Sequence, residues 1–229
     1  MIAGPILIVA AHPDDEALGC GGTIARLAAS GVAVHVLLLG DGVTARGARS
    51  VRDRGAIAGR ARAARQACKI LGARPPYLEA FPDNRFDSVV LLDIVKRVEA
   101  VVAKVRPVAV FTHHGSDLNI DHRVTHQAVV TACRPLPGVP TKALYCFETV
   151  SSTEWSSAEI GDVFRPQRFV AIDSYLETKL RALDCYADEM RAPPHARSRE
   201  NVVQLARLRG ATVGLPAAEA FTIVREIVD

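Results

Sequence analysis

Short apolar runs alternate along the chain with segments whose apolar residues recur every three or four positions. The runs predict buried strands over residues 6–11, 32–40, 77–81, 108–113, 143–150, 169–173 and near 220–227. Helical periodicity appears over residues 23–31, 61–72 and 88–105. Strands that alternate with helices in this way are typical of βαβ units. We therefore predict an α/β, Rossmann-like three-layer fold with a mostly parallel central sheet and helices on both faces.

Two stretches interrupt this alternation and predict ordered loops, residues 151–168 and 193–200. A helix over about 174–190 lies between them, and another helix begins near Asp121. Loops of this length in a compact domain often line a site. The chain shows no internal repeat or low-complexity tract, so we expect one domain spanning residues 1–229.

Composition narrows the function classes. The 28 basic and 25 acidic residues are scattered, so the net charge of +3 leaves no electrostatic footprint for nucleic acid. The apolar N-terminus lacks a basic leader, and no run reaches the roughly 18 to 20 apolar residues that cross a bilayer. We expect a cytoplasmic protein without an integral membrane segment, and the sequence leaves a homo-oligomer open.

Five cysteines show no paired short spacing. They predict small buried hydrophobic side chains in a reducing compartment, not a disulfide framework or a cysteine zinc site.

Chemistry-bearing side chains gather where two predicted strands end. The stretch AHPDDE, residues 11–16, follows the first strand, and HHGSDLNIDHRVTH, residues 113–126, follows the strand at 108–113. Ligands of open parallel sheets bind beyond the carboxyl ends of the strands. Both clusters therefore belong to one candidate site.

A dinucleotide-binding turn is the first alternative for the AHPDDE stretch, because a glycine-rich segment follows it and Asp41 ends the second strand. The pattern Gly19-x-Gly21-x-x-Ile24 lacks the third glycine, however. Three carboxylates at the strand end would also repel a pyrophosphate. The glycines more plausibly let the first helix pack tightly behind the acidic turn.

A cation would relieve the crowding of these carboxylates. His12 and Asp15, joined by a histidine of the second cluster, form a two-imidazole, one-carboxylate set with open positions, which suits catalysis. Periodicity alone does not select among His113, His114, His122 and His126. A simpler alternative is that the acids cap the first helix, although one acid would suffice for that.

The AHPDDE stretch, together with the pattern (N/H)xDHxxxH at residues 119–126, resembles the PIG-L/LmbE family of zinc-dependent N-deacetylases that act on N-acetylglucosamine-type groups. The resemblance covers nearly the whole chain. It implies that His12, Asp15 and His122 hold zinc and that Asp14 is the general base. The same donors would suit Fe²⁺ or another divalent metal.

Asp121, beside His122, is expected to orient an imidazole or balance a proton. The family commonly has histidine where this chain has Asn119, which can donate a hydrogen bond to an oxyanion but cannot supply a proton. We therefore expect Asp14 to return its proton as the general acid, with His195 assisting; His114 is a further candidate.

Candidate substrate-binding residues follow the ends of predicted elements. Arg62, Asp83, Asn84 and Arg85 suit sugar hydroxyls or a phosphate, although exposed or salt-bridged roles fit them equally well. His114 completes this group. Trp155, the single tryptophan, lies in the loop at 151–168, where it would stack on a sugar ring or pack the loop.

The predicted function is a metal-dependent hydrolase that removes the N-acetyl group from an N-acetylglucosamine-type sugar or its conjugate, a small-molecule partner. Two alternatives stay open. One is a non-haem iron oxygenase with the same ligand set, and the other is a non-catalytic, metal-stabilised binding protein.

Overall fold

A computed structural model of the chain describes residues 4–43 and 51–228. The strands are β1 (Ile6–Ala10), β2 (Val34–Gly40), β3 (Tyr77–Phe81), β4 (Ala109–His113), β5 (Ala143–Phe147), β6 (Arg168–Ala171) and β7 (Ala218–Glu226). The helices are α1 (Asp15–Ala29), α2 (Val51–Ile70), α3 (Leu91–Val105), α4 (Ile120–Ala132), α5 (Leu176–Leu183) and α6 (Arg199–Ala211). Strands and helices alternate through α4, as the apolar pattern predicts.

The seven strands form one sheet in the order β3-β2-β1-β4-β5-β7-β6. The first five are parallel, with Leu7 of β1 beside both His35 of β2 and Val110 of β4. β7 runs antiparallel between β5 and β6. The prediction of a mostly parallel sheet is confirmed, with one antiparallel strand inserted near an edge.

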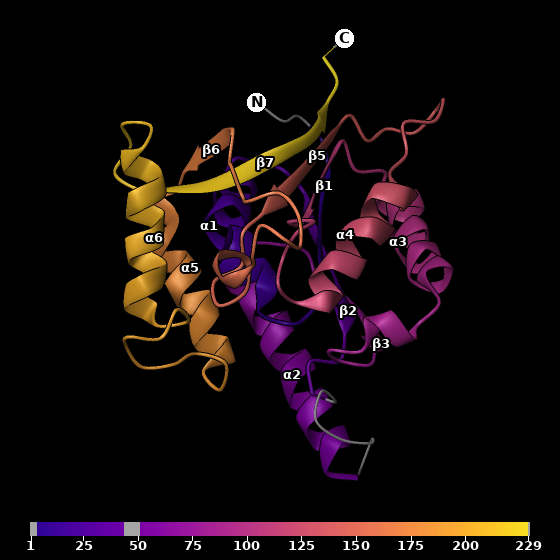
Figure 1. Ribbon diagram of the computed structural model, residues 1–229, viewed down its shortest axis with the longest axis horizontal. Helices are drawn as coiled ribbons and strands as arrows, with labels where there is room; N and C mark the ends of the chain where they lie inside the picture. Colours follow the sequence, from indigo (N-terminus) through magenta and orange to yellow (C-terminus); the bar gives the residue numbers. More distant parts are fainter. Residues whose placement is uncertain (1–3, 44–50, 229) are drawn as a thin grey trace.

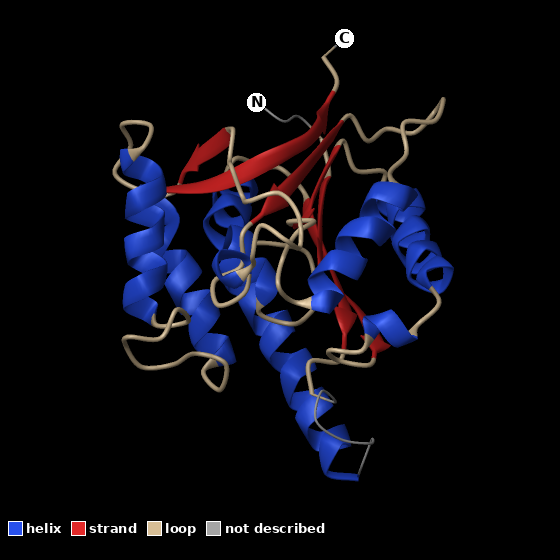
Figure 2. Cartoon of the chain, viewed as in Figure 1, coloured by secondary structure: helices blue, strands red, loops and turns tan. Residues whose placement is uncertain are grey.

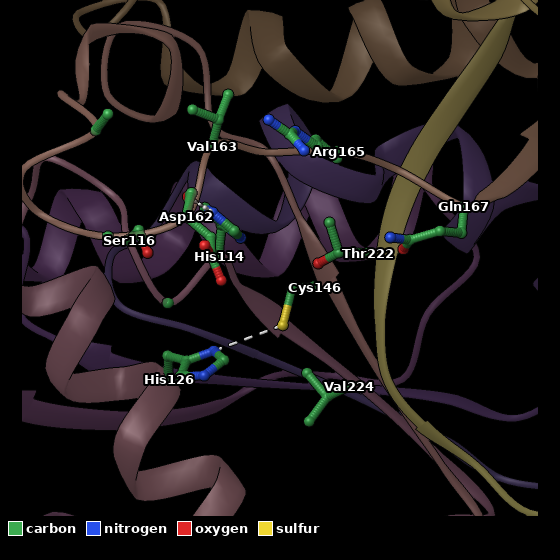
Figure 3. Close-up of a pocket in the computed structure, with 13 residues that line it drawn as sticks. His114, Ser116, His126, Cys146, Asp162, Val163, Arg165, Gln167, Thr222 and Val224 are labelled. Carbon is green, nitrogen blue, oxygen red and sulfur yellow. Dashed lines mark hydrogen bonds between the residues drawn. The ribbon is translucent and has the colours of Figure 1, made fainter.

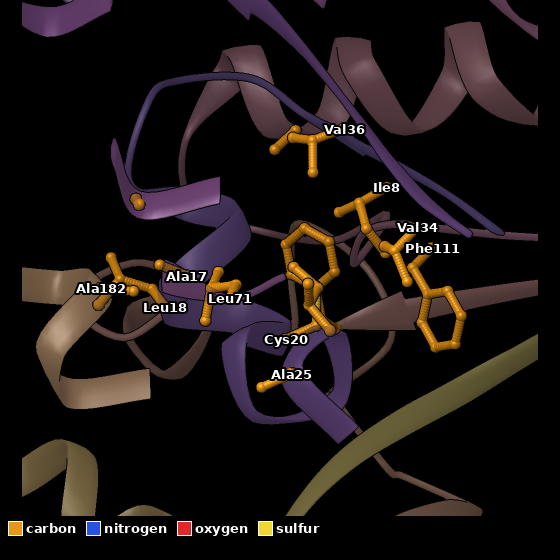
Figure 4. Close-up of a cluster of buried hydrophobic side chains, with 14 of the residues drawn as sticks. Ile8, Ala17, Leu18, Cys20, Ala25, Val34, Val36, Leu71, Phe111 and Ala182 are labelled. Carbon is orange, nitrogen blue, oxygen red and sulfur yellow. The ribbon is translucent and has the colours of Figure 1, made fainter. Parts of the chain in front are cut away.

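Helices cover both faces of the sheet and make three layers (Figures 1 and 2). Along β1, Ile6 and Ile8 join the core under α1, α2, α5 and α6, whereas Leu7 and Val9 join the core under α3 and α4. Figure 4 shows part of the first core, which includes Ile8 and Phe111 of the sheet and Ala17 and Leu18 of α1. Because both faces of the central strands are buried, their sequences are continuously apolar.

Glycines in α1 allow the helix to approach its neighbours closely, as the sequence predicts. A Cβ atom on Gly19 would lie 2.2 Å from the Phe147 ring, and one on Gly22 would lie 2.8 Å from Ile172. Any larger residue would push the helix off the sheet and move the acidic turn at its start.

The C-terminal helices differ from the prediction. The helix expected over 174–190 is the shorter α5, with single 3-10 turns at residues 173–175 and 184–186. The expected loop at 193–200 ends in α6, a helix that the apolar pattern did not predict. α6 is largely polar and buries few residues, so its periodicity is weak. Its start signal is Ser198, whose side chain accepts a hydrogen bond from the Asn201 amide.

The parallel strands β1 to β5 end at one edge of the sheet, where the loops after β1, β3, β4 and β5 meet. Within the described residues, no helix is both long and apolar enough to cross a membrane.

Candidate metal centre and active site

His12 and Asp15 lie on the tight turn that joins β1 to α1. Asp14 precedes the first residue of the helix and has φ of +130°, a conformation that non-glycine residues rarely adopt. Its carbonyl oxygen accepts hydrogen bonds from the amides of Ala17 and Leu18, which start the helix. Backbone strain of this kind persists where the surroundings hold it, and it is often found at functional sites.

His12, Asp15 and His122 form a compact group of potential metal ligands. Asp15 Oδ2 lies 3.4 Å from His12 Nδ1 and 3.3 Å from His122 Nε2. Asp15 and His122 are fully buried, and 12% of the His12 side chain is exposed. Residues 110 positions apart thus meet because β1 and β4 are neighbours in the sheet.

Two atoms of this group lack the partners that burial normally requires. Among the described residues, Asp15 Oδ1 and His122 Nε2 have no hydrogen-bond partner. Buried polar atoms are nearly always satisfied, and one left alone costs about 1–3 kcal/mol. Metal coordination would give buried atoms of this group a partner, so the residues fit the metal that the family resemblance implies.

A second acidic group shares His12 but is already satisfied. His12 Nε2 lies 2.9 Å from Asp121 Oδ2 and 3.1 Å from Asp83 Oδ1. Asp121 also accepts the amides of Asn84 (2.6 Å) and Phe86 (2.9 Å). Asp121 therefore orients the imidazole of His12, leaving Nδ1 to face Asp15. The predicted orienting role fits this contact, although the imidazole is that of His12 and not that of the adjacent His122.

Asp117 performs the corresponding role for His122, which the sequence did not indicate. Its Oδ1 lies 3.1 Å from His122 Nδ1 and accepts the hydroxyl of Ser152, while Oδ2 accepts the hydroxyl of Thr153 (2.6 Å). A carboxylate on the far nitrogen of a ligating histidine fixes its tautomer and orientation. The only sequence signal was the position of Asp117 within the histidine-rich cluster.

His113 is buried directly behind these residues. Its ring stacks on that of His122 at 3.8 Å, and its Nε2 accepts the Ala11 amide at 2.9 Å. Because this nitrogen is already used, His113 supports the site from behind and does not compete as a ligand.

The site is strongly negative. Although burial lowers the pKa of His122, the neighbouring charges of Asp15 and Asp117 raise it to about 9. Hydrogen bonds to three carboxylates likewise hold the pKa of His12 well above its usual value despite burial. Both imidazoles therefore sit where positive charge is favoured, which is the field a bound cation requires.

Asp14 is paired with a residue that the sequence did not single out. Arg197 Nη1 lies 2.6 Å from Asp14 Oδ2, and Arg197 Nε donates to Ser151 Oγ at 2.8 Å. Burial raises the pKa of Asp14 to about 6, while the Arg197 charge opposes that rise. Arg197 lies two positions after His195, so the segment of the predicted His195 approaches Asp14 through a different residue.

Glu16 stabilises the turn between β1 and α1 that contains Asp14. Its side chain accepts the Asp14 amide at 3.1 Å and the hydroxyl of Tyr186 at 2.7 Å. Burial raises the pKa of Glu16 to about 7. The fourth polar residue of the AHPDDE stretch thus supports the backbone conformation of Asp14.

Asn119 and His195 do not contact the metal-ligand group. Asn119 caps α4, with Oδ1 accepting the Asp121 amide at 2.8 Å and Nδ2 donating to Asn84 Oδ1 at 3.1 Å. His195 Nδ1 accepts the Arg197 amide at 3.0 Å, and its ring forms a T-shaped pair with Trp155.

The predicted substrate residues divide between several places. Asp83 lies against His12, whereas Arg62 and Arg85 are exposed. Arg60, not Arg62, lines a hollow of about 680 Å³ that also contains Asp83 and Asn84. His114 lines a different hollow of about 770 Å³, where its Nε2 lies 2.8 Å from the carbonyl oxygen of Asp162 (Figure 3).

Residues 7–133 match the family described as PIG-L, GlcNAc-PI de-N-acetylase. This match includes the turn after β1 and all three candidate metal ligands. The chain belongs to the PIG-L family.

Two relatives extend the similarity beyond that range. The "Uncharacterized deacetylase YaiS" of Escherichia coli is 32% identical over 184 residues, covering 78% of this chain and 88% of the relative. A "Probable N-acetyl-alpha-D-glucosaminyl L-malate deacetylase 2" of Bacillus cereus is 27% identical over 193 residues, 82% of this chain and 84% of the relative. Membership of the PIG-L family and these relatives support a deacetylase, not an oxygenase or a binding protein.

Among solved structures, an N,N'-diacetylchitobiose deacetylase from Pyrococcus horikoshii superposes with a TM-score of 0.78 at 20% identity. The superposition covers 97% of this chain and 84% of the other. At this identity the likeness shows the fold, which agrees with the predicted three-layer α/β architecture.

Proposed function

We propose that this protein is a zinc-dependent hydrolase that removes the acetyl group from an N-acetylglucosamine-type sugar or its conjugate. One observation carries the proposal: a buried His12–Asp15–His122 group with two unsatisfied donor atoms lies beside a separate carboxylate, Asp14. Two relatives are named as deacetylases of sugars, an N-acetyl-alpha-D-glucosaminyl L-malate and diacetylchitobiose, and these names support the same substrate class.

His12, Asp15 and His122 would hold the metal, for which zinc is our proposal because two imidazoles and one carboxylate are a common catalytic zinc set. When bound, a divalent metal lowers the pKa of water and polarises a carbonyl group. Asp121 and Asp117 would keep the two imidazoles in place, each through a hydrogen bond to the nitrogen that faces away from Asp15.

Asp14 would act as the general base toward the attacking water. It is not part of the ligand group, and its pKa of about 6 suits proton transfer near neutral pH. Arg197 would hold the carboxylate in one orientation through the 2.6 Å contact. We propose that Asp14 also returns the proton to the leaving amine, because Asn119 has no acidic proton and His195 does not contact Asp14.

The sugar ring would occupy the hollow that Asp83 and Asn84 share with Arg60. Asp83 joins this hollow to the metal ligands through His12, so hydroxyl groups near the acetamide would meet Asp83 and the amide side chain of Asn84. Arg60 pairs with Glu189 across the same hollow. The lining of the hollow therefore contains both a positive and a negative side chain, which suits a neutral ligand with several hydroxyl groups.

The test is acetate release under anaerobic conditions. The protein is stripped with a chelator, reloaded with zinc or iron, and incubated with N-acetylglucosamine and its conjugates. We expect acetate and a free amine in equal amounts, only after metal loading. Activity that needs oxygen and a reductant would favour the oxygenase. No acetate from any N-acetylated sugar after loading with either metal would refute the proposed function.

A further inference from the structure

A groove of about 650 Å³ lies between the loop after β5 and helix α6. We call it the Trp155 groove. Its apolar lining consists of Val150, Trp155, Pro194, Ala196, Leu205 and Leu208. Figure 1 shows α6 at the outside of its helix layer.

Two large apolar side chains of this groove are unusually exposed. Trp155 is 53% exposed and Leu208 is 58% exposed. The Trp155 and His195 rings form a T-shaped pair with centroids 5.9 Å apart, so the two aromatic side chains of the groove lie side by side. Contiguous exposed apolar surface of this kind often marks a binding site.

The groove adjoins the candidate active site through shared segments. Arg197, which contacts Asp14, also donates to Ser151 Oγ. Ser151 follows the groove residue Val150, and Arg197 follows the groove residue Ala196. Arg197 therefore links Asp14 to the two segments that supply Val150 and Ala196 to the groove.

The charges of the groove disfavour an anionic ligand. Arg209 is the one lysine or arginine among the described lining residues, and Glu148 engages it through two bonds of 2.7 and 2.6 Å. Glu154 brings a further carboxylate, which accepts the amides of Ser151 and Ser152. A phosphate would thus meet two carboxylates and an arginine that is already neutralised.

We propose that the Trp155 groove binds an uncharged, apolar aglycone attached to the N-acetylated sugar. This inference rests on the proposed function and names its substrate class. An alkyl or aryl group would cover Trp155 and Leu208, whereas a nucleotide or sugar phosphate would not be accommodated.

Binding can be tested without turnover, because Trp155 is the single tryptophan of the chain. Metal-free protein is titrated with the n-hexyl β-glycoside of N-acetylglucosamine, with free N-acetylglucosamine and with N-acetylglucosamine 1-phosphate. We expect a saturable change in tryptophan emission with the hexyl glycoside at concentrations where the other two have no effect. An equal response to the 1-phosphate, or no response to the hexyl glycoside, would overturn the proposal.

Kinetics separate this proposal from the function on which it rests. The ratio of kcat/KM for the hexyl glycoside to that for free N-acetylglucosamine should be on the order of tenfold, through KM. Leu208→Ser should bring this ratio toward one, whereas Val163→Ser, a matched control that is 59% exposed in the other hollow, should preserve it. A ratio of one in the wild-type protein contradicts the aglycone site while leaving the deacetylase intact. Absence of acetate from every sugar contradicts the deacetylase itself. In that case the fluorescence titration still tests whether the groove binds the hexyl glycoside.

Discussion

Two pairs of histidines lie near the same edge of the sheet, and the groups that contact the two pairs differ. His12 and His122 face Asp15, and each has a second carboxylate on its other ring nitrogen. His114 and His126 line the hollow of Figure 3, where His114 bonds to the carbonyl oxygen of Asp162 and His126 bonds to the carbonyl oxygen of His113 and contacts the Cys146 thiol.

The carboxylates make the difference. They raise the pKa of His122 to about 9, whereas burial lowers the pKa of His126, one helical turn later, below its usual value. A histidine-rich stretch therefore does not define a metal site by itself. The candidate ligands His12 and His122 are the imidazoles that carboxylates surround and orient.

The largest expected effect follows from removing one histidine of each pair. His122→Ala should abolish stoichiometric zinc binding and reduce acetate release to background, because the ligand group loses an imidazole. His126→Ala should keep both. Metal analysis after gel filtration and an acetate assay measure the two variants side by side. Zinc retained by His122→Ala but lost by His126→Ala would reverse the comparison.

The next effect concerns the carboxylate that is not a ligand. Asp14→Ala should lower kcat by about 10²- to 10⁴-fold while the protein still binds zinc, because the general base is lost but the ligands remain. Metal content and kcat are measured on the same preparation. Unchanged turnover would show that Asp14 is not the base.

A smaller effect is expected from the carboxylate that orients His122. Asp117→Asn should weaken zinc affinity by about 10- to 100-fold, since the amide cannot stabilise the ring in the same way. Asp162→Asn is the matched control, because the bond to His114 uses the Asp162 backbone oxygen, which the substitution leaves in place. Competition with a zinc-binding dye measures both affinities. Equal affinities for the two variants would argue that orientation by Asp117 is unimportant.

The smallest effect is a pH dependence of stability in the second pair. The pKa of His126 is below 6.5 in the folded protein because of burial, so the unfolded chain takes up a proton first as pH falls. His126 therefore contributes a loss of stability as pH falls below 6.5, and His126→Gln lacks this contribution. Urea unfolding at pH 7, 6 and 5 measures the difference. A gap between the two proteins that does not change with pH would contradict the buried neutral imidazole.

Much of the fold was predictable because burial on both faces leaves a strong apolar pattern in β1, β2, β4 and β5. Helix α6 was not, since it presents a polar surface and contributes only Val202, Ala206 and Gly210 to the buried interior. The position of β7 between β5 and β6 could not be predicted from the sequence either, because strand order depends on pairing and not on local composition.

The candidate site was predictable where the chain concentrates its chemistry. His12, Asp15 and His122 come together as the resemblance implies, and Asp83 and Asp121 join them. The roles of Arg197 and Asp117 were not predicted, because each residue acts through a contact between segments that are separate in the sequence. Arg62 and Arg60 could not be told apart, because the side of α2 that faces the hollow depends on how that helix packs.

The sequence by itself determined the layered α/β architecture, the location of the chemistry at the strand ends and the family. Apolar periodicity and the residues of one tight turn are local properties, so they can be read without coordinates. The tertiary structure decided which imidazoles have carboxylate partners, which arginine meets Asp14, and where an apolar groove opens beside them. Those features depend on distances between side chains on separate loops, and only the packed sheet brings those loops together.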